Sequence, residues 1–263
     1  MSATFVGSIP ALYDRHLGPV LFEPYARDLA RRLPPRSRAV LEVAAGTGRV
    51  TRHLLAALPP DAQLLATDLS EAMLACAAAA VTDPRVTWHA ADAQALPAPD
   101  GTVDVVVCQF GLMFVPDQDR ALAEMRRVLR PGGVLLLSTW NALAANPMTA
   151  RLHALATAAS PGNPPDFMLV PFSLHDRAAL ARRLEGAGFG GVLAETVAQV
   201  AEAVSAADVA TGLVRGNPLA TQLAERGVDA DRFEREVAQA MAEAFGAAPC
   251  RSPLSAHVFT ARA

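Results

Sequence analysis

Residues 40–51 read VLEVAAGTGRVT, an apolar β-type run that passes through a glycine turn into the start of a helical pattern. In open parallel sheets, cofactors bind at the carboxyl ends of the strands, next to turns of this kind. Gly46 and Gly48 let the backbone approach a ligand closely, because a glycine has no Cβ and tolerates a positive φ. We therefore expect a cofactor loop at this turn.

Two carboxylates strengthen that expectation. Asp68 and Asp92 close the next two β-type runs along the chain. A carboxylate at the end of the second strand is placed to accept hydrogen bonds from the hydroxyls of a ribose. A glycine turn followed by two such carboxylates is much stronger evidence for a nucleoside-type cofactor than a glycine motif alone.

From residue 39 onward, short β-branched runs alternate with alanine-, leucine- and arginine-rich helical runs, which is typical of βαβ units. The runs that predict strands are 39–43, 63–67, 85–89, 103–109, 134–139, 192–200 and 255–261. The runs that predict helices are 49–58, 70–81, 117–129, 174–188 and stretches within 206–245. PGG at 131–133 predicts a turn. These runs predict an α/β fold with a Rossmann-like, seven-stranded, mostly parallel sheet and helices on both faces.

We predict a single domain over residues 1–263. Its four parts are an N-terminal helical cover at 1–37, a cofactor-binding core at 38–140, a proline-rich insertion after the fifth strand at 141–175, and C-terminal helices and last strands at 176–263. The insertion is expected to cover the substrate at the carboxyl edge of the sheet.

Four segments resemble class I S-adenosylmethionine-dependent methyltransferases of the UbiE-like, type 11 kind. They are LEVAAGTG at 41–48, TDLSEAML at 67–74, ADAQALP at 91–97 and LAEMRRVLRPGG at 122–133. The resemblance spans roughly residues 39–140 and implies S-adenosylmethionine as the cofactor. The residues expected to bind it are Tyr13, Glu42, Ala44, Gly46, Gly48, Asp68, Leu69, Met73, Asp92, Ala93 and Gln109.

One residue departs from the family pattern, and two have alternative interpretations. Ala44 stands where the family usually has a glycine, which the loop tolerates if φ there is negative. Glu42 could be a solvated carboxylate at a strand end, and Asp68 could only cap the following helix. Thr51 stands where a dinucleotide-binding turn has its third glycine, which disfavours a nicotinamide cofactor.

The segment IPALYDRH at 9–16 resembles the Tyr-Asp stretch that precedes the core in UbiE-like enzymes. The resemblance implies a mobile cover in which Tyr13 contacts the methionine part of the cofactor, with His16 or Phe22 facing the acceptor. An amphipathic helix that simply packs against the sheet is the alternative.

Methyl transfer needs alignment more than acid-base chemistry, because a sulfonium is already a good leaving group. A general base helps when the acceptor is a weakly acidic hydroxyl or carbon acid. The candidates are His16 and His175, since both lie in segments expected to cover the cofactor.

The acceptor class follows from what is missing after the fourth strand, where the sequence is CQFG at 108–111. The Asn/Asp-Pro-Pro-Tyr motif of DNA-base and protein-glutamine methyltransferases is not there, nor is the magnesium-binding aspartate of catechol-type enzymes. We expect a metal-independent enzyme for a small hydrophobic or aromatic molecule. The candidate substrate residues are Phe22, Tyr25, Met113, Trp140, Met148, Phe167, Met168 and Phe172.

The composition excludes several functions. The chain has no lysine, which removes Schiff-base chemistry and the P-loop nucleotidases. A net charge of -3 gives no footprint for nucleic acid, and no apolar run approaches the roughly 18 residues that cross a bilayer. We expect a cytoplasmic monomer or homodimer whose partner is a small-molecule substrate, not nucleic acid or a membrane.

Three functions of different classes remain open. The first is a methyltransferase. The second is a related fold that binds the sulfonium cofactor and catalyses another reaction, such as a cyclisation. The third is a non-catalytic regulatory partner, which the intact Gly46, Gly48, Asp68 and Asp92 disfavour.

Overall fold

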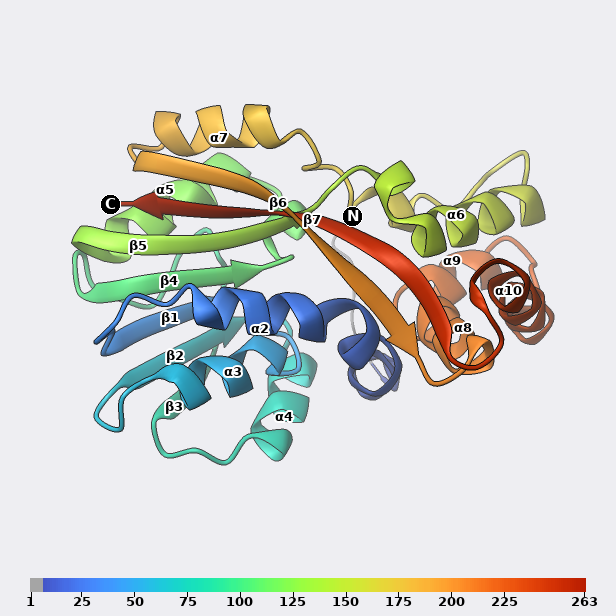
Figure 1. The fold of residues 1–263 in the computed structure, drawn as a ribbon, viewed down its shortest axis with the longest axis horizontal. Coiled ribbons are helices and arrows are strands. Elements are labelled where there is room, and N and C mark those ends of the chain that lie inside the picture. Colours follow the sequence, from blue (N-terminus) through green and yellow to red (C-terminus); the bar gives the residue numbers. More distant parts are fainter. Residues whose placement is uncertain (1–6) are drawn as a thin grey trace.

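The computed structural model describes residues 7–263, and its centre is a seven-stranded sheet with the strand order β3-β2-β1-β4-β5-β7-β6 (Figure 1). The strands are β1 Ala39–Val43, β2 Gln63–Asp68, β3 Val86–Ala90, β4 Val103–Gln109, β5 Leu129–Trp140, β6 Gly190–Ala203 and β7 Cys250–Arg262. The first five are mutually parallel, and β7 is antiparallel to both of its neighbours. The predicted Rossmann-like, mostly parallel sheet is confirmed.

Helices cover both faces of this sheet. One face packs against α2 (Glu23–Arg31) and α3 (Arg49–Ala57), and the other against α5 (Gln118–Val128) and α7 (Arg177–Gly186). Alternate residues of β4 enter the two layers, Val107 on the first side and Val106 on the second. Because both faces are covered, the central strands read as nearly continuous apolar runs.

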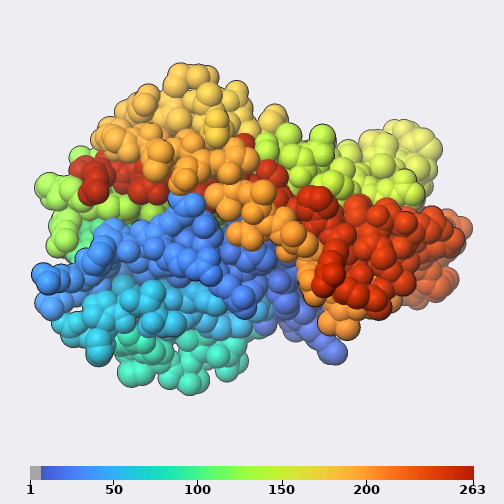
Figure 2. All heavy atoms as spheres, in the orientation of Figure 1, coloured from blue at the N-terminus to red at the C-terminus, as the bar shows by residue number. Residues whose placement is uncertain are grey.

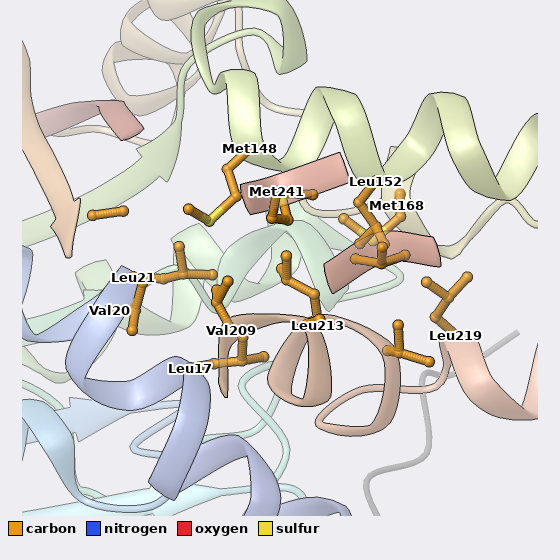
Figure 3. Packing of buried hydrophobic residues seen from close by; sticks show 14 of the residues in the cluster. Leu17, Val20, Leu21, Met148, Leu152, Met168, Val209, Leu213, Leu219 and Met241 are labelled. Carbon is orange, nitrogen blue, oxygen red and sulfur yellow. The ribbon is translucent and has the colours of Figure 1, made fainter. Parts of the chain in front are cut away.

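A helical lobe, formed by four helices, lies at one end of the sheet (Figures 1 and 2). Its members are α6 (Pro147–Ala159), α8 (Ala206–Arg215), α9 (Leu219–Ala224) and α10 (Ala230–Phe245). They share a buried cluster with the N-terminal segment, in which Met148, Leu213 and Met241 lie close together (Figure 3). The predicted insertion and the C-terminal helices therefore form one lobe, although they are separate in sequence.

The last two strands are longer than predicted because they pair with each other beyond the end of β5. The β6–β7 register continues from Ala198 opposite Ser255 to Ala203 opposite Cys250, which carries both strands into the lobe. Pro253 lies within this extension and masks it in the sequence, since proline is disfavoured inside strands.

The predicted turn at 131–133 is wrong, because those residues belong to β5. The register between β4 and β5 shifts between Val103 and Val105, and Gly132 has a φ of 79°. The glycines are absorbed in a bulged strand, which uses the same conformational freedom that a turn would need.

The N-terminal segment is helical from Ile9 to Arg31, and the rest of its described part is turn or coil; residues 1–6 of the predicted 1–37 lie outside the described residues. It comprises α1 (Ile9–Leu12), the π-helix η1 (Tyr13–Phe22) and α2. Leu17 and Leu21 of η1 point toward α8 (Figure 3). No helix within residues 7–263 is long and apolar enough to cross a membrane.

Candidate active site

The glycine turn has the geometry that its sequence requires. Gly46 and Gly48 have φ values of 56° and 76°, in the left-handed region that favours glycine. A Cβ on Gly48 would lie 3.1 Å from Cη2 of Trp88 and 3.2 Å from Cβ of Ala77. The turn is therefore packed closely against α4 (Glu71–Ala80) and leads directly into α3.

Asp68 is fixed beside this turn by backbone amides. Its Oδ2 accepts a hydrogen bond from the Gly46 amide at 2.8 Å, and its Oδ1 accepts one from the Ser70 amide at 2.8 Å. Burial raises the pKa of the Asp68 carboxyl, and the two amide hydrogen bonds oppose that rise. The N-cap of α4 is Ser70, whose Oγ accepts from the Met73 amide, so Asp68 is not the capping residue.

Glu42 is sequestered between β1 and α3. Only 2% of the residue is exposed, and its Oε2 accepts a 2.6 Å hydrogen bond from Oγ1 of Thr51. Burial raises the pKa of Glu42 to about 8. The alternative of a solvated strand-end carboxylate is therefore wrong, and Thr51 occupies the third-glycine position as a buried hydrogen-bond donor.

Ala44 adopts a left-handed backbone conformation, which is unfavourable for an alanine. Its φ is +56°, so the condition of a negative φ, under which the loop would tolerate an alanine, is not met. A Cβ on Gly111 would lie 2.4 Å from Cβ of Ala44, which means that Gly111 provides the space for the alanine side chain. An alanine in the left-handed region carries a cost of about 1 kcal/mol.

The other predicted cofactor residues lie around the same edge. Asp92 accepts hydrogen bonds at Oδ1 from the backbone and side-chain amides of Gln94. Leu69 is 67% exposed beside Asp68, whereas Met73 is buried in α4. Gln109 donates from Nε2 to the Phe22 carbonyl at 3.2 Å, and its buried Oε1 has no partner among the described residues. Ala93 lies next to Asp92 and is partly buried.

The N-terminal segment is tied to the glycine turn by an ionic cluster. Asp14 accepts hydrogen bonds at 2.8 Å from both Oγ1 of Thr47 and Nη2 of Arg49. A Cβ on Gly18 would lie 2.3 Å from Nη2 of Arg49, so this arginine passes directly over the π-helix backbone. Burial and the nearby Asp68 charge raise the pKa of the Tyr13 hydroxyl, which therefore stays protonated at neutral pH.

Next to this edge lies a cavity with about 690 Å³ of space between atoms, part of it open to solvent. Its walls come from the π-helix, the ends of β4 and β5, the insertion, α8 and β7. The lining residues are Tyr13, Leu17, Leu21, Phe22, Phe110, Phe114, Trp140, Asn146, Thr149, Phe167, Met168, Pro171, Phe172, Leu213, Asn217 and Leu254.

The structure brings five of the eight predicted substrate residues to this cavity: Phe22, Trp140, Phe167, Met168 and Phe172. The other three, Tyr25, Met113 and Met148, are buried in the surrounding core and do not line it. Tyr25 packs edge-on against Trp140 with the ring centroids 5.4 Å apart. These three therefore support the wall from behind.

The few polar groups in the wall are already occupied by the protein. Asn146 donates to the Ser255 carbonyl at 3.1 Å and accepts from the Ser255 amide at 2.9 Å. Asn217 is bonded in the same way to Leu213 and Leu219, and Thr149 donates to the Asn146 carbonyl. Among the described residues, none that lines the cavity is acidic, basic or histidine.

Neither histidine proposed as a base lines the cavity. Nδ1 of His16 lies 2.9 Å from Oδ1 of Asp208, so this side chain faces α8. Nδ1 of His175 lies 2.8 Å from the Phe172 carbonyl oxygen. Within residues 7–263, no group of three or more His, Cys, Asp or Glu side chains is placed to hold a metal ion.

Several cavity residues were missed by the sequence analysis. Leu17 and Leu21 follow Tyr13 at intervals of four, a helical spacing that could have placed them on the same face. Phe110 directly follows the predicted Gln109. In contrast, Leu213, Asn217 and Leu254 come from the C-terminal lobe, and no local pattern connects them with the cofactor edge.

Sequence comparisons relate the part of the chain that contains the glycine turn and Asp68 to known methyltransferases. Residues 40–133 match a family model described as a methyltransferase domain. The ubiquinone/menaquinone biosynthesis C-methyltransferase UbiE of Saccharophagus degradans is 41% identical over 102 residues, and that of Burkholderia mallei is 41% identical over 100. Each match covers 37% of this chain and 41% of the relative, so the chain spans about two fifths of the length of these curated relatives.

Solved structures share the fold over most of the chain. Phosphoethanolamine N-methyltransferase 2 of Haemonchus contortus, in complex with S-adenosyl-L-methionine, superposes with a TM-score of 0.60 at 16% identity, covering 96% of this chain and 56% of that one. The cyclase SpnF superposes with a TM-score of 0.57 at 19% identity, covering 97% and 92%. At these identities the likeness shows the fold alone.

Proposed function

We propose that this chain, which carries a class I S-adenosylmethionine-dependent methyltransferase domain, methylates a small apolar or aromatic molecule bound in the cavity. The observation that supports this most directly is the position of Tyr13. Its side chain lines the cavity, and the next residue, Asp14, accepts a 2.8 Å hydrogen bond from Oγ1 of Thr47 in the glycine turn. The cavity therefore adjoins the edge where the cofactor ribose is expected.

The cofactor residues divide by position. Asp68 would accept hydrogen bonds from the ribose hydroxyls, while Leu69, Met73, Asp92 and Ala93 would surround the adenine. The turn that contains Glu42, Ala44, Gly46 and Gly48 would face the rest of the molecule, with Tyr13 and Gln109 near its methionine part. The cofactor supplies an electrophilic methyl group on a positively charged sulfur.

The cavity walls would perform the alignment. Apolar side chains exclude water, and a confined acceptor attacks the methyl carbon along a restricted direction, which can contribute about 7 to 11 kcal/mol in favourable cases. Because Tyr13 stays protonated, it can donate a hydrogen bond but is a poor base. Neither His16 nor His175 lines the cavity. Their role as a general base stays a prediction.

A carbon acceptor is one possibility within this proposal, because the matched relatives are named C-methyltransferases. The family match ends at residue 133, however, before α6, η4 (Phe167–Leu169) and α8, which supply much of the wall. The acceptor of those relatives therefore cannot be assumed to be the acceptor of this chain.

A non-methylating reaction is the second candidate. The cavity wall, within the described residues, offers no acid or base other than the Tyr13 hydroxyl, which also suits a reaction that needs only confinement. A cyclisation is of this kind. The structural likeness to the cyclase SpnF shows only that the fold is compatible with such chemistry.

Calorimetry combined with a methyl-transfer assay tests the proposal. Purified protein should bind S-adenosylmethionine and S-adenosylhomocysteine but not NAD, and should transfer label from the cofactor to members of a phenol, amine and carboxylate panel. Binding without transfer to any member would favour the cyclisation or a regulatory role. Binding of NAD alone would contradict the proposal.

We also propose that the reaction needs no metal ion, that the protein is a cytoplasmic monomer or homodimer, and that nucleic acid and membranes are not its partners. Transfer should persist in chelator. Loss of transfer in chelator with recovery on adding Mg²⁺ would contradict metal independence.

A further inference from the structure

We infer that Phe110 determines the specificity of the cavity, because it forms with Trp140 a rigid two-ring wall that selects a flat aromatic acceptor over a saturated one of equal size. The inference rests on the proposed function in one respect, namely that the cavity is the acceptor site. Phe110 directly follows the last residue of β4, Gln109.

The backbone of Phe110 is held in an unusual conformation. Its φ is +52°, which for a bulky side chain is a genuine outlier. Such conformations persist where the surrounding structure imposes them, and they gather at functional sites. Here the Phe110 amide donates to the Ser138 carbonyl at 3.1 Å, which extends the β4–β5 pairing by one residue.

The next residue is closely packed and leaves no room for a side chain. A Cβ on Gly111 would lie 2.4 Å from Cβ of Ala44 and 3.1 Å from Sγ of Cys108. The backbone therefore turns sharply at Phe110 and directs its ring across the end of β5, onto Trp140.

The two rings lie in almost parallel planes. Their centroids are 3.9 Å apart and the interplanar angle is 1°. Tyr25 is fully buried and meets both rings edge-on, with centroid distances of 5.4 Å and angles of 89° and 90°. Phe22 packs at 6.0 Å from Phe110 and 6.1 Å from Trp140. These contacts on several sides oppose tilting and sliding of the Phe110–Trp140 pair.

Two other stacked pairs line the cavity, Tyr13–Phe22 with centroids 4.8 Å apart at 21° and Phe114–Phe167 with centroids 6.4 Å apart at 22°, but both are farther apart and less parallel than Phe110–Trp140. Met168 and Leu213 line the cavity with flexible side chains that adapt to many shapes. Aromatic pairs also gain affinity beyond the area that they bury, which a saturated ring cannot match. Of these three pairs, Phe110–Trp140 is the closest and the most nearly parallel, so selection between flat and saturated guests comes mainly from the Phe110–Trp140 wall.

Two probes of one carbon skeleton test this inference by calorimetry. Naphthalen-2-ol is flat, and trans-decahydronaphthalen-2-ol carries the same hydroxyl on a saturated frame. The wild-type protein should bind the flat probe more tightly by about 2- to 10-fold, the affinity equivalent of one aromatic pair. Phe110→Leu should remove this preference, because a leucine fills space without stacking.

Phe114→Leu is the matched control. Phe114 lines the same cavity, but its ring stacks on Phe167 at 6.4 Å and takes no part in the Phe110–Trp140 pair. This variant should weaken both probes and keep the ratio of their affinities. If Phe110→Leu does not fold, Trp140→Leu replaces it, since it removes the partner ring and should also abolish the preference.

Equal wild-type affinity for the two probes, binding of neither probe, or an unchanged affinity ratio in the folded variant would overturn the inference. Binding of S-adenosylhomocysteine, measured in the same samples, separates it from the proposed function. Loss of the probe preference in Phe110→Leu with no cofactor binding by any protein would sustain the role of Phe110 in the cavity and contradict methyl transfer.

Discussion

The edge proposed to bind the cofactor (the cofactor edge) and the cavity proposed to bind the acceptor are neighbours, yet they are built in opposite ways. The cofactor edge consists of backbone amides and carboxylates from short contiguous segments, as in the 2.8 Å contact from Gly46 to Asp68. The cavity is an apolar enclosure assembled from the π-helix, two strand ends, the insertion and the helical lobe. One region is therefore encoded locally, and the other exists only after the chain has folded.

The difference predicts that a leucine in the cavity wall matters mainly for stability, whereas a leucine at the cofactor edge matters mainly for cofactor binding. Leu17 is 3% exposed in the cavity wall, so Leu17→Ala should lower the free energy of unfolding by about 2 to 5 kcal/mol. Leu69 is 67% exposed at the cofactor edge, so Leu69→Ala should change stability by less than about 0.5 kcal/mol and instead weaken S-adenosylmethionine binding.

Urea unfolding and calorimetry on both variants measure these effects. An equal loss of stability in the two variants would show that the cofactor edge depends on packing as much as the cavity does, and the division would fail.

The pH dependence of stability should arise at the cofactor edge. Glu42 has a pKa raised to about 8 by burial in the folded protein, against 4.5 for the ordinary group. Between these values the unfolded chain binds fewer protons than the folded one, so stability should fall as pH rises through this window. The loss between pH 5 and pH 8 should be on the order of a few kcal/mol.

Glu42→Gln should remove that slope, since a glutamine oxygen can still accept the hydrogen bond from Thr51 but does not ionise. Unfolding titrations at pH 5, 6.5 and 8 compare the two proteins. A wild-type slope that survives in Glu42→Gln would place the responsible group elsewhere.

Asp68→Ala should weaken binding of the cofactor without changing binding in the cavity. Removing hydrogen bonds to a charged group costs about 1.5 to 3 kcal/mol, which corresponds to a roughly 10- to 150-fold weaker affinity for S-adenosylmethionine. The affinity of the cavity for naphthalen-2-ol should not change. Calorimetry with each ligand decides, and unchanged cofactor affinity would move the ribose away from Asp68.

The contrast also explains how far the sequence could be interpreted. The strands 39–43 and 103–109 have the predicted bounds, because a buried parallel strand has a strong local apolar pattern. The turn at Gly46 follows from the first of these strands, and the position of Asp68 follows from the strand predicted at 63–67. The lengths of β6 and β7 were underestimated because their outer halves are strands only through pairing with each other.

For the site, as for the fold, the sequence predicted only the parts that lie in or next to strong local patterns. Phe22 and Trp140 belong to segments next to the motifs, and the cavity includes them. Leu213 and Leu254 could not be predicted, since only the tertiary fold brings α8 and β7 to the π-helix.

Leu17 and Leu21 pack against α8, so deletion of the residues before Pro24 would expose buried apolar surface. Point substitutions are therefore better tests of the predicted cover than a truncation.

The smallest expected effect concerns Ala44, where the locally encoded region departs from its own pattern. Ala44→Gly should raise the free energy of unfolding by about 0.5 to 1 kcal/mol, because a glycine adopts a φ of +56° without the steric cost that an alanine incurs. The matched control is Ala56→Gly on the exposed side of α3, which should lower stability by about 1 kcal/mol through its helix propensity. The same substitution should therefore have opposite signs at two positions only twelve residues apart, and urea unfolding measures both. If both variants lose stability, the turn does not hold Ala44 in the left-handed region, and the cofactor edge is less strained than its backbone indicates.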